Sequence, residues 1–377
     1  MAFKDIHKLK KIVEVQKEFI ETEYLVIGKD VYSIAIYRDL VSKHGEEKVR
    51  LLSEDTITAS DVFLKGPSTL RGETNKKLAK GLFPALETTA VDANSIFYKD
   101  LTWKSFGGRS KPEALKYDEE FYVNSRLNVS EKDIFDWLSS EESFYEELNN
   151  KAYKVKIKSI NYSEGKFLVE CINGTEFHTG NLFFGKSPAY FLKHYKELSH
   201  LSNKFVQFCE STSSVSALFI KYVFEKPFSD LQETMFIPLS YTHEHGHYVG
   251  EFKTQNGHQV ADFLHYIDEN HASEEDISRI IRGLKKGFEK IFENFSKINF
   301  REYIALEDEI ACLKIDDNSY NDSLESDKEI HFHLTFIGEN APLNKTWRDS
   351  ITFEYSSESI SHMARALFVH KEILKKI

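Results

Sequence analysis

Apolar and polar positions near the start of the chain follow a strand, helix, strand order. Residues 23–28 form a short apolar run with β-branched side chains that stops at a glycine, and this run predicts a strand. Apolar residues then recur at roughly helical spacing through residues 31–43, which predicts a helix. Residues 48–54 predict a second short strand that ends in an acidic residue. Together they make a βαβ unit, which indicates the opening of a parallel sheet.

The middle of the chain alternates apolar and polar residues in short runs. These runs predict strands over residues 154–160, 166–172, 175–178 and 182–184. The turns between them include Asn173-Gly174, and Asn-Gly between alternating strands is the strongest short-range signal of a hairpin. We therefore expect an antiparallel meander here.

The remaining pattern predicts a second sheet and further helices. Strands are expected over residues 215–224, 235–239, 248–253, 260–267 and 303–315. Ser130 with Asp133 predicts the start of a helix that reaches about residue 148, and Ser273 with Asp276 predicts the start of a long amphipathic helix. The acidic and polar stretch 316–328 predicts a solvated loop. A strand over 330–337 and a helix over 358–376 are expected to follow it.

Length and charge exclude several classes of protein. At about 150 residues per domain, 377 residues correspond to about two to three domains. A net charge of −11 and a pI near 5.8 argue against a dedicated nucleic-acid binder, because phosphate neutralisation needs a surplus of Lys and Arg. No apolar run approaches the roughly 20 residues of a membrane span, and no secretory signal is visible at the start. We therefore expect a cytoplasmic protein, with a substrate or protein partner that the sequence does not specify.

Two features of the composition bear on possible sites. Cys171, Cys209 and Cys312 are odd in number and far apart, so they predict neither a disulfide framework nor a metal site. The chain holds 30 Phe and 18 Tyr against 3 Met. This excess is typical of a well-packed aromatic core, and it is also compatible with an apolar cavity for a planar ligand. Composition alone leaves both interpretations open.

The βαβ unit can be compared with the dinucleotide fingerprint G-x-G-x-x-G, in which glycines let the backbone approach a pyrophosphate. Gly28 occupies the first glycine position, Asp30 the second and Ser33 the third. Ser33 is a small residue and a mild substitution. Asp30 adds a negative charge where the anionic pyrophosphate would meet backbone N–H groups. Glu54 stands where the ribose-binding acid is expected, although an acid after a strand is also common in proteins without a nucleotide.

The order of these motifs resembles the superfamily of FAD-dependent amine oxidases, protoporphyrinogen oxidases and phytoene desaturases. The βαβ unit ends in Glu54, the meander runs from Ile157 to Leu-Phe-Phe-Gly-Lys-Ser-Pro at 182–188, and Phe-Ile-Gly-Glu at 336–339 precedes a closing helix. The resemblance implies an α/β fold. It comprises a Rossmann-like FAD/NAD(P)-binding domain and an interleaved α+β substrate domain. The first would comprise residues 1–75, 150–200 and 328–377, and the second residues 76–149 and 201–327.

The resemblance also implies roles for individual residues in the first half of the chain. Gly28 and Ser33 would face the pyrophosphate. Glu54 would hold the adenosine ribose, and Ile157 would meet adenine through its backbone. The cofactor implied by these contacts is FAD.

Near the end of the chain, the resemblance implies that Gly338 and Glu339 meet the pyrophosphate and the ribityl chain. With FAD bound, the activity would be removal of hydride from an amine or a C–H substrate, in which the flavin supplies the reactivity. Amine-oxidising relatives need no strong acid or base, so no catalytic residue is assigned.

Departures from the family pattern support a second hypothesis. Asp30 replaces a glycine, and the G-G-R expected after the ribose acid is absent, with only Leu70-Arg71-Gly72 as a faint substitute. These departures favour a cofactor-free pseudoenzyme of the same fold, which would act as a binding or scaffold protein. The sequence leaves the flavin-dependent oxidoreductase and the pseudoenzyme both open.

Two further motifs suggest sites of other kinds. His243, His245 and His247 would share one face of a strand and could bind a metal, but Gly246 interrupts that strand and favours a solvent-exposed hairpin. No metal site is therefore predicted. The loop at 106–112 contains Gly-Gly with Arg109 and Lys111 and is compatible with an anion-binding loop or with a surface turn.

Overall fold

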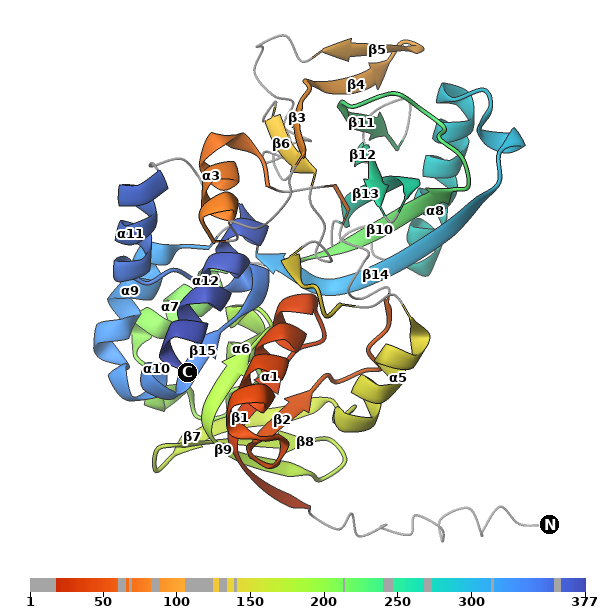
Figure 1. Ribbon diagram of the computed structural model, residues 1–377. Helices are drawn as coiled ribbons and strands as arrows, with labels where there is room; N and C mark the ends of the chain where they lie inside the picture. Colours follow the sequence, from red (N-terminus) through yellow and green to blue (C-terminus); the bar gives the residue numbers. More distant parts are fainter. Residues whose placement is uncertain are drawn as a thin grey trace, which may run out of the picture.

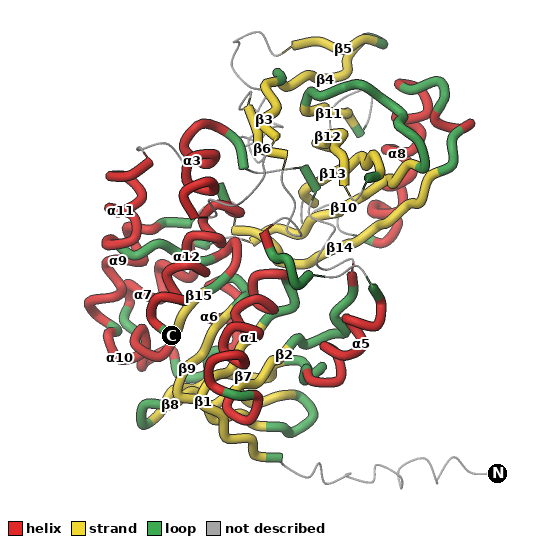
Figure 2. The backbone as a smooth tube through the Cα atoms, in the orientation of Figure 1, coloured by secondary structure: helices red, strands yellow, loops and turns green. Residues whose placement is uncertain are grey.

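The computed structural model describes residues 18–59, 66–67, 70–82, 89–105, 125–128, 134–138, 141–212, 214–239, 247–255, 257–267, 273–312, 315–355 and 361–377. Figure 1 shows the helices and strands that these residues form, and Figure 2 shows most of the strands gathered in two groups, one above the other. The lower group forms one sheet and most of the upper group forms another. We call them the first sheet and the second sheet.

The first sheet contains strands from both ends and the middle of the chain. Its members are β1 (Phe19–Ile27), β2 (Val49–Leu52), β7 (Ile157–Ser163), β8 (Lys166–Cys171), β9 (Glu176–Phe184) and β15 (Leu334–Phe336). β1 pairs in parallel with β2 on one side and with β9 on the other. The expected parallel βαβ opening is therefore confirmed, with α1 (Val31–His44) as the connecting helix.

The expected meander is also confirmed, with one difference. β7, β8 and β9 are antiparallel neighbours. The runs predicted as separate strands over 175–178 and 182–184 form the single strand β9. Its first part pairs with β8 and its last part with β15, so the strand continues across both partners.

The second sheet has the strand order β14-β10-β13-β12-β11-β4-β5 in the described part of the chain. Its members are β4 (Ser95–Lys99), β5 (Thr102–Ser105), β10 (Ser214–Phe224), β11 (Thr234–Pro238), β12 (His247–Gln255), β13 (His258–Ile267) and β14 (Phe300–Cys312). A short pair, β3 (Thr89–Asp92) and β6 (Ser125–Asn128), lies outside both sheets.

The remaining described helices cover these sheets. They are α3 (Gly72–Leu82), α5 (Glu142–Lys151), α6 (Pro188–His194), α7 (Asn203–Ser211), α8 (Glu274–Ile291), α9 (Asp317–Ser326), α10 (Lys328–His333), α11 (Lys345–Tyr355) and α12 (His362–Lys376). α1 and α12 contact each other, and Figure 1 shows them side by side over the first sheet. The expected helix starting at Ser273 is confirmed, because Ser273 Oγ accepts a hydrogen bond from Asp276 N at the start of α8.

Aromatic side chains fill the core between α8 and the second sheet. Phe288 of α8 lies fully buried, and its ring centroid is 5.3 Å from that of Phe263 and 4.8 Å from that of Phe295. Tyr222 of β10 joins the same cluster. Much of the aromatic excess is therefore packed core, as the first of the two interpretations held.

The stretch 316–328 is not the loop that its polar composition predicts. It contains α9, which Asp316 caps by accepting hydrogen bonds from Asn318 N and Ser319 N. α9 buries Tyr320 and Ser323 against its neighbours, and this burial stabilises a helix that the polar composition did not predict. The expected strand over 330–337 is likewise shortened to β15, because α10 takes up its first residues, including His331 and His333.

The helix expected from Ser130 begins later. α5 starts at Glu142, while Ser130 and Asp133 lie outside the described residues. The proposed domain boundaries stay a prediction. Phe205 and Phe208 of α7 and Tyr320 of α9, which that prediction assigned to the substrate domain, lie in one buried cluster with the first sheet.

Candidate dinucleotide site

The turn between β1 and α1 has the close packing that a dinucleotide fingerprint requires. Gly28 has φ +146°, and a Cβ atom there would lie 2.2 Å from Ser33 Oγ. Gly185, just after β9, is equally restricted, because a Cβ atom would lie 2.7 Å from the carbonyl oxygen of Ile27. Both positions therefore require glycine. Ser33 is fully buried between them and leaves no room for a larger residue.

Asp30 is the N-cap of α1. Its Oδ1 accepts hydrogen bonds from Tyr32 N at 2.9 Å and Ser33 N at 3.1 Å, and its Oδ2 accepts one from Ser33 Oγ at 2.7 Å. The carboxylate thus binds the N–H groups at the positive end of the helix dipole, which are the groups that hold a phosphate in dinucleotide-binding proteins.

A third glycine approaches the same carboxylate from the end of the chain. Gly338 is buried, has φ +78° and follows β15. A Cβ atom on Gly338 would lie 3.6 Å from Asp30 Oδ1, and Cβ atoms on Gly28 and Gly185 would lie 3.3 and 3.4 Å from Asp30 Oδ2. We call the space where Gly28, Gly185 and Gly338 meet the glycine cradle. The structure brings Gly28, Ser33 and Gly338 close to the Asp30 carboxylate, which lies in the cradle. Their contact with a pyrophosphate stays a prediction.

Glu54 follows β2 with φ +62° and is 7% exposed. Its Oε1 accepts hydrogen bonds from Ile157 N at 3.0 Å and from the Tyr190 hydroxyl at 2.8 Å, and its Oε2 lies 3.0 Å from Lys186 Nζ. Burial by itself raises the pKa of this carboxyl. The Lys186 cation and the two hydrogen bonds outweigh burial and hold the pKa below its usual range.

The predicted ribose acid and the predicted adenine contact are therefore bonded to each other. The N–H of Ile157, which the resemblance directs at adenine, donates to Glu54. Sequence reasoning missed Lys186 and Tyr190 as partners of this carboxylate. Lys186 precedes Ser187, which caps α6, so a helix start after β9 was the available signal for both residues.

The N-terminus of α12 is the second helix end beside the cradle. Ser361 caps it by accepting from Ala364 N, and Ser361 N donates to Asn75 Oδ1 at 3.0 Å. The predicted site residue Glu339 offers its backbone oxygen to His362 Nδ1 at 3.4 Å. This helix end, like that of α1, is bonded within the protein.

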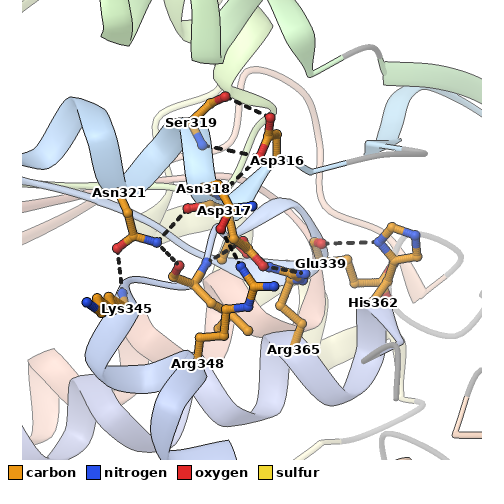
Figure 3. A network of polar contacts seen from close by, with 12 residues as sticks. Asp316, Asp317, Asn318, Ser319, Asn321, Glu339, Lys345, Arg348, His362 and Arg365 are labelled. Carbon is orange, nitrogen blue, oxygen red and sulfur yellow. Dashed lines mark hydrogen bonds and ion pairs between the residues drawn. The ribbon is translucent and has the colours of Figure 1, made fainter. Parts of the chain in front are cut away.

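Figure 3 shows the polar network that holds α12 in this position. Arg365 donates two hydrogen bonds to the Asp317 carboxylate, at 2.7 and 3.1 Å. Asp317 Oδ1 also accepts from Leu343 N at 2.8 Å, and Arg348 donates to Asn318 at 2.6 Å. The two-pronged ion contact therefore ties α12 to α9. The segment after Gly338 and Glu339 is tied to the same pair, because Leu343 N donates to Asp317 and Arg365 donates to the Ala341 carbonyl oxygen.

Arg71, the faint substitute for the missing G-G-R, is directed at the second sheet. Its guanidinium lies 2.7 Å from Glu251 Oε2 and donates to Thr234 Oγ1 at 2.7 Å. Arg126 of β6 contacts the same Glu251 oxygen at 3.1 Å. Both arginines and Glu251 are at most 3% exposed, so they form a buried ion cluster that the sequence pattern did not reveal.

These contacts test whether the residues present fit FAD. A pyrophosphate in the glycine cradle would meet the Asp30 carboxylate, and like charges about 4 Å apart repel by about 4 kcal/mol at an effective dielectric constant near 20. A ribose at Glu54 would have to share the carboxylate with Lys186, Tyr190 and the Ile157 N–H, which already bind it. The backbone frame of a dinucleotide site is present, but its polar groups do not fit the cofactor.

The other two candidate motifs fall largely outside the described residues. His243 and His245 lie there, as does the loop at 106–112, whereas His247 begins β12 and is buried. Among the residues that the structure describes, no three His, Cys, Asp or Glu side chains are grouped as metal ligands. In the same part of the chain, no helix is both long and apolar enough to span a membrane.

Comparison with known proteins places the fold. No protein-family model matches the sequence, and no curated protein matches it. An oxidoreductase from Methanosarcina mazei matches the structure with a TM-score of 0.52 at 10% identity, over 94% of this chain and 100% of that one. A triple mutant from a redesign of cofactor binding in putrescine oxidase matches with a TM-score of 0.51 at 9% identity, over 95% and 99%.

At this level of identity the likeness shows the fold alone. The chain has the α/β fold of the flavin amine oxidases, as the order of its motifs led us to expect. Activity and cofactor do not follow from the likeness.

Proposed function

We propose that this protein is a cofactor-free member of the amine oxidase fold that acts as a binding or scaffold protein. The flavin-dependent oxidation of an amine or C–H substrate is the alternative that the fold keeps open. The proposal rests on the bonding of Glu54.

The Glu54 carboxylate has all its described contacts within the chain, and these supply both charge and hydrogen bonds. Lys186 neutralises it, while Tyr190 and the Ile157 N–H each donate to it. The Glu54 side chain is 5% exposed, so a ribose that replaced one of these partners would break a buried charge-assisted hydrogen bond. A carboxylate in this state supports the packing of β2, β7 and α6 rather than the capture of adenosine.

Flavin content and FAD titration test the proposal directly. We expect the purified protein to release no flavin on denaturation, and added FAD to leave its unfolding temperature unchanged. A bound ligand at 100 times its dissociation constant would add about 2.7 kcal/mol to the free energy of unfolding, so binding would be readily seen. Saturable stabilisation by FAD, or stoichiometric flavin in the purified protein, would overturn the proposal.

A matched substitution separates the two functions of Glu54. Glu54→Gln keeps the size of the side chain and removes its charge. Under the proposed function it lowers stability in the absence of any nucleotide and has no effect on FAD binding, because there is none to lose. If Glu54 instead holds ribose, the variant weakens FAD binding relative to the wild type.

A further inference from the structure

The Asp30 carboxylate lies where three separate parts of the chain meet. Gly28 follows β1, Gly185 follows β9 and Gly338 follows β15, and all three lie beside the carboxylate. None of the three can carry a Cβ atom without approaching within 3.6 Å of a carboxylate oxygen. We infer that Asp30 is an internal ligand of this cradle, and that the cradle accepts a free phosphate-class anion once that carboxylate is removed.

The Asp30 carboxylate caps the helix, and it accepts hydrogen bonds from the same kinds of group that would bind a free anion. Its two oxygens accept from two backbone N–H groups and from the buried Ser33 hydroxyl. The first turn of α1 has no other acidic residue, so Asp30 supplies the negative charge at this end of a 14-residue helix. Removing it exposes the same donors to a mobile anion.

A second helix provides an internal comparison. Asp316 caps α9 with the same three contacts: it accepts from Asn318 N at 3.0 Å, Ser319 N at 3.2 Å and Ser319 Oγ at 2.7 Å. The helix-capping chemistry of Asp30 and Asp316 is therefore matched. Three described glycines lie close enough to Asp30 that a Cβ atom on them would contact its carboxylate. No described glycine has such a contact with Asp316. The glycine cradle is what distinguishes the two sites.

The inference rests on the proposed function and adds to it, because it names the Asp30 carboxylate as the group that occupies the position of the pyrophosphate. Glycine is tolerated at an N-cap at a cost of a few tenths of a kcal/mol. Asp30→Gly therefore removes the carboxylate and its Cβ while α1 keeps its start. Asp30→Ser is a second variant that retains a capping hydroxyl and still vacates part of the cradle. Asp316→Gly is the matched control.

The probe is inorganic pyrophosphate, titrated into each protein at constant ionic strength, with binding followed by calorimetry and by the unfolding temperature. We expect saturable, one-to-one binding to Asp30→Gly at least tenfold tighter than to the wild type or to Asp316→Gly, with a smaller gain for Asp30→Ser. Equal stabilisation of all four proteins would be a general salt effect and would overturn the inference, as would folded Asp30 variants that bind no tighter than the wild type.

The two proposals fail in different ways. FAD binding by the wild type overturns the proposed function whatever the Asp30 variants do. A wild type without FAD affinity, together with Asp30 variants without pyrophosphate affinity, keeps the proposed function and overturns the internal-ligand inference.

Discussion

The buried cluster around Glu251 gives a direct test of whether one carboxylate balances two buried arginines beside the second sheet. Glu251 is fully buried on β12, and one of its oxygens contacts both Arg71 and Arg126. Glu251→Gln keeps the shape of the side chain and removes the charge that both guanidinium groups face. Losing one partner of a buried ion pair costs about 3 to 5 kcal/mol, because the remaining charge stays out of water.

Denaturant unfolding followed by tryptophan fluorescence measures this loss. The chain has 3 Trp, and Trp103 lies half-buried on the edge strand β5, where its ring centroid is 6.5 Å from that of Phe292 and it packs against the core of the second sheet. Changing Trp137 and Trp347 to Phe leaves Trp103 as the reporter of that sheet. In this background we expect Glu251→Gln to lower the free energy of unfolding by about 3 to 5 kcal/mol.

The control is an exposed ion pair of the same kind. Glu147 of α5 lies 3.6 Å from Lys151 with a side chain that is 75% exposed, and Glu147→Gln is expected to cost at most about 1 kcal/mol. If Glu251→Gln is no more costly than Glu147→Gln, the carboxylate does not balance the two arginines, and the structural interpretation of the cluster is refuted.

Two further predictions concern the packing around α9. Burial lowers the pKa of His331 to about 4, so the unfolded chain binds a proton between about pH 6.5 and pH 4 that the folded protein does not. Stability is therefore full above about pH 6.5 and falls by about 3 kcal/mol as the pH drops to about 4. His331→Phe should remove this part of the pH dependence in urea titrations, and an unchanged slope would contradict the prediction. Arg365→Lys should cost about 1 to 3 kcal/mol in the same assay, because lysine cannot make the two-pronged contact with Asp317. A Lys variant as stable as the wild type would show that charge alone holds α12.

Local signals were sufficient for the frame of the candidate site. The β-branched run before Gly28, the Asn173-Gly174 turn and the cap at Ser273 each depend on neighbours within a few residues, and the structure bears out the elements they predicted. Gly28 in the fingerprint and Gly338 near the end of the chain could be aligned with a dinucleotide site because each follows a predicted strand.

The prediction of a loop failed in a polar stretch whose burial depends on residues far away in the sequence. Residues 316–328 contain few apolar positions, yet α9 forms because Tyr320 and Ser323 are buried, Asp316 caps the helix and Asp317 accepts a hydrogen bond from Leu343 N. Helix propensity is a weak guide when tertiary contacts supply the stability.

The sequence by itself determined the βαβ opening, the meander and the positions of Asp30 and Glu54 beside the strands of that unit, because periodicity and turn residues act locally. Only the tertiary structure decided what those acids do. It folds Gly185 and Gly338 onto Asp30, and it brings Lys186, Tyr190 and the Ile157 N–H to Glu54 across gaps of more than a hundred residues. Whether a carboxylate faces a ligand or the protein's own hydrogen-bond donors depends on which residues the fold places beside it. Those residues are far away in the sequence, so no local pattern predicts the contact.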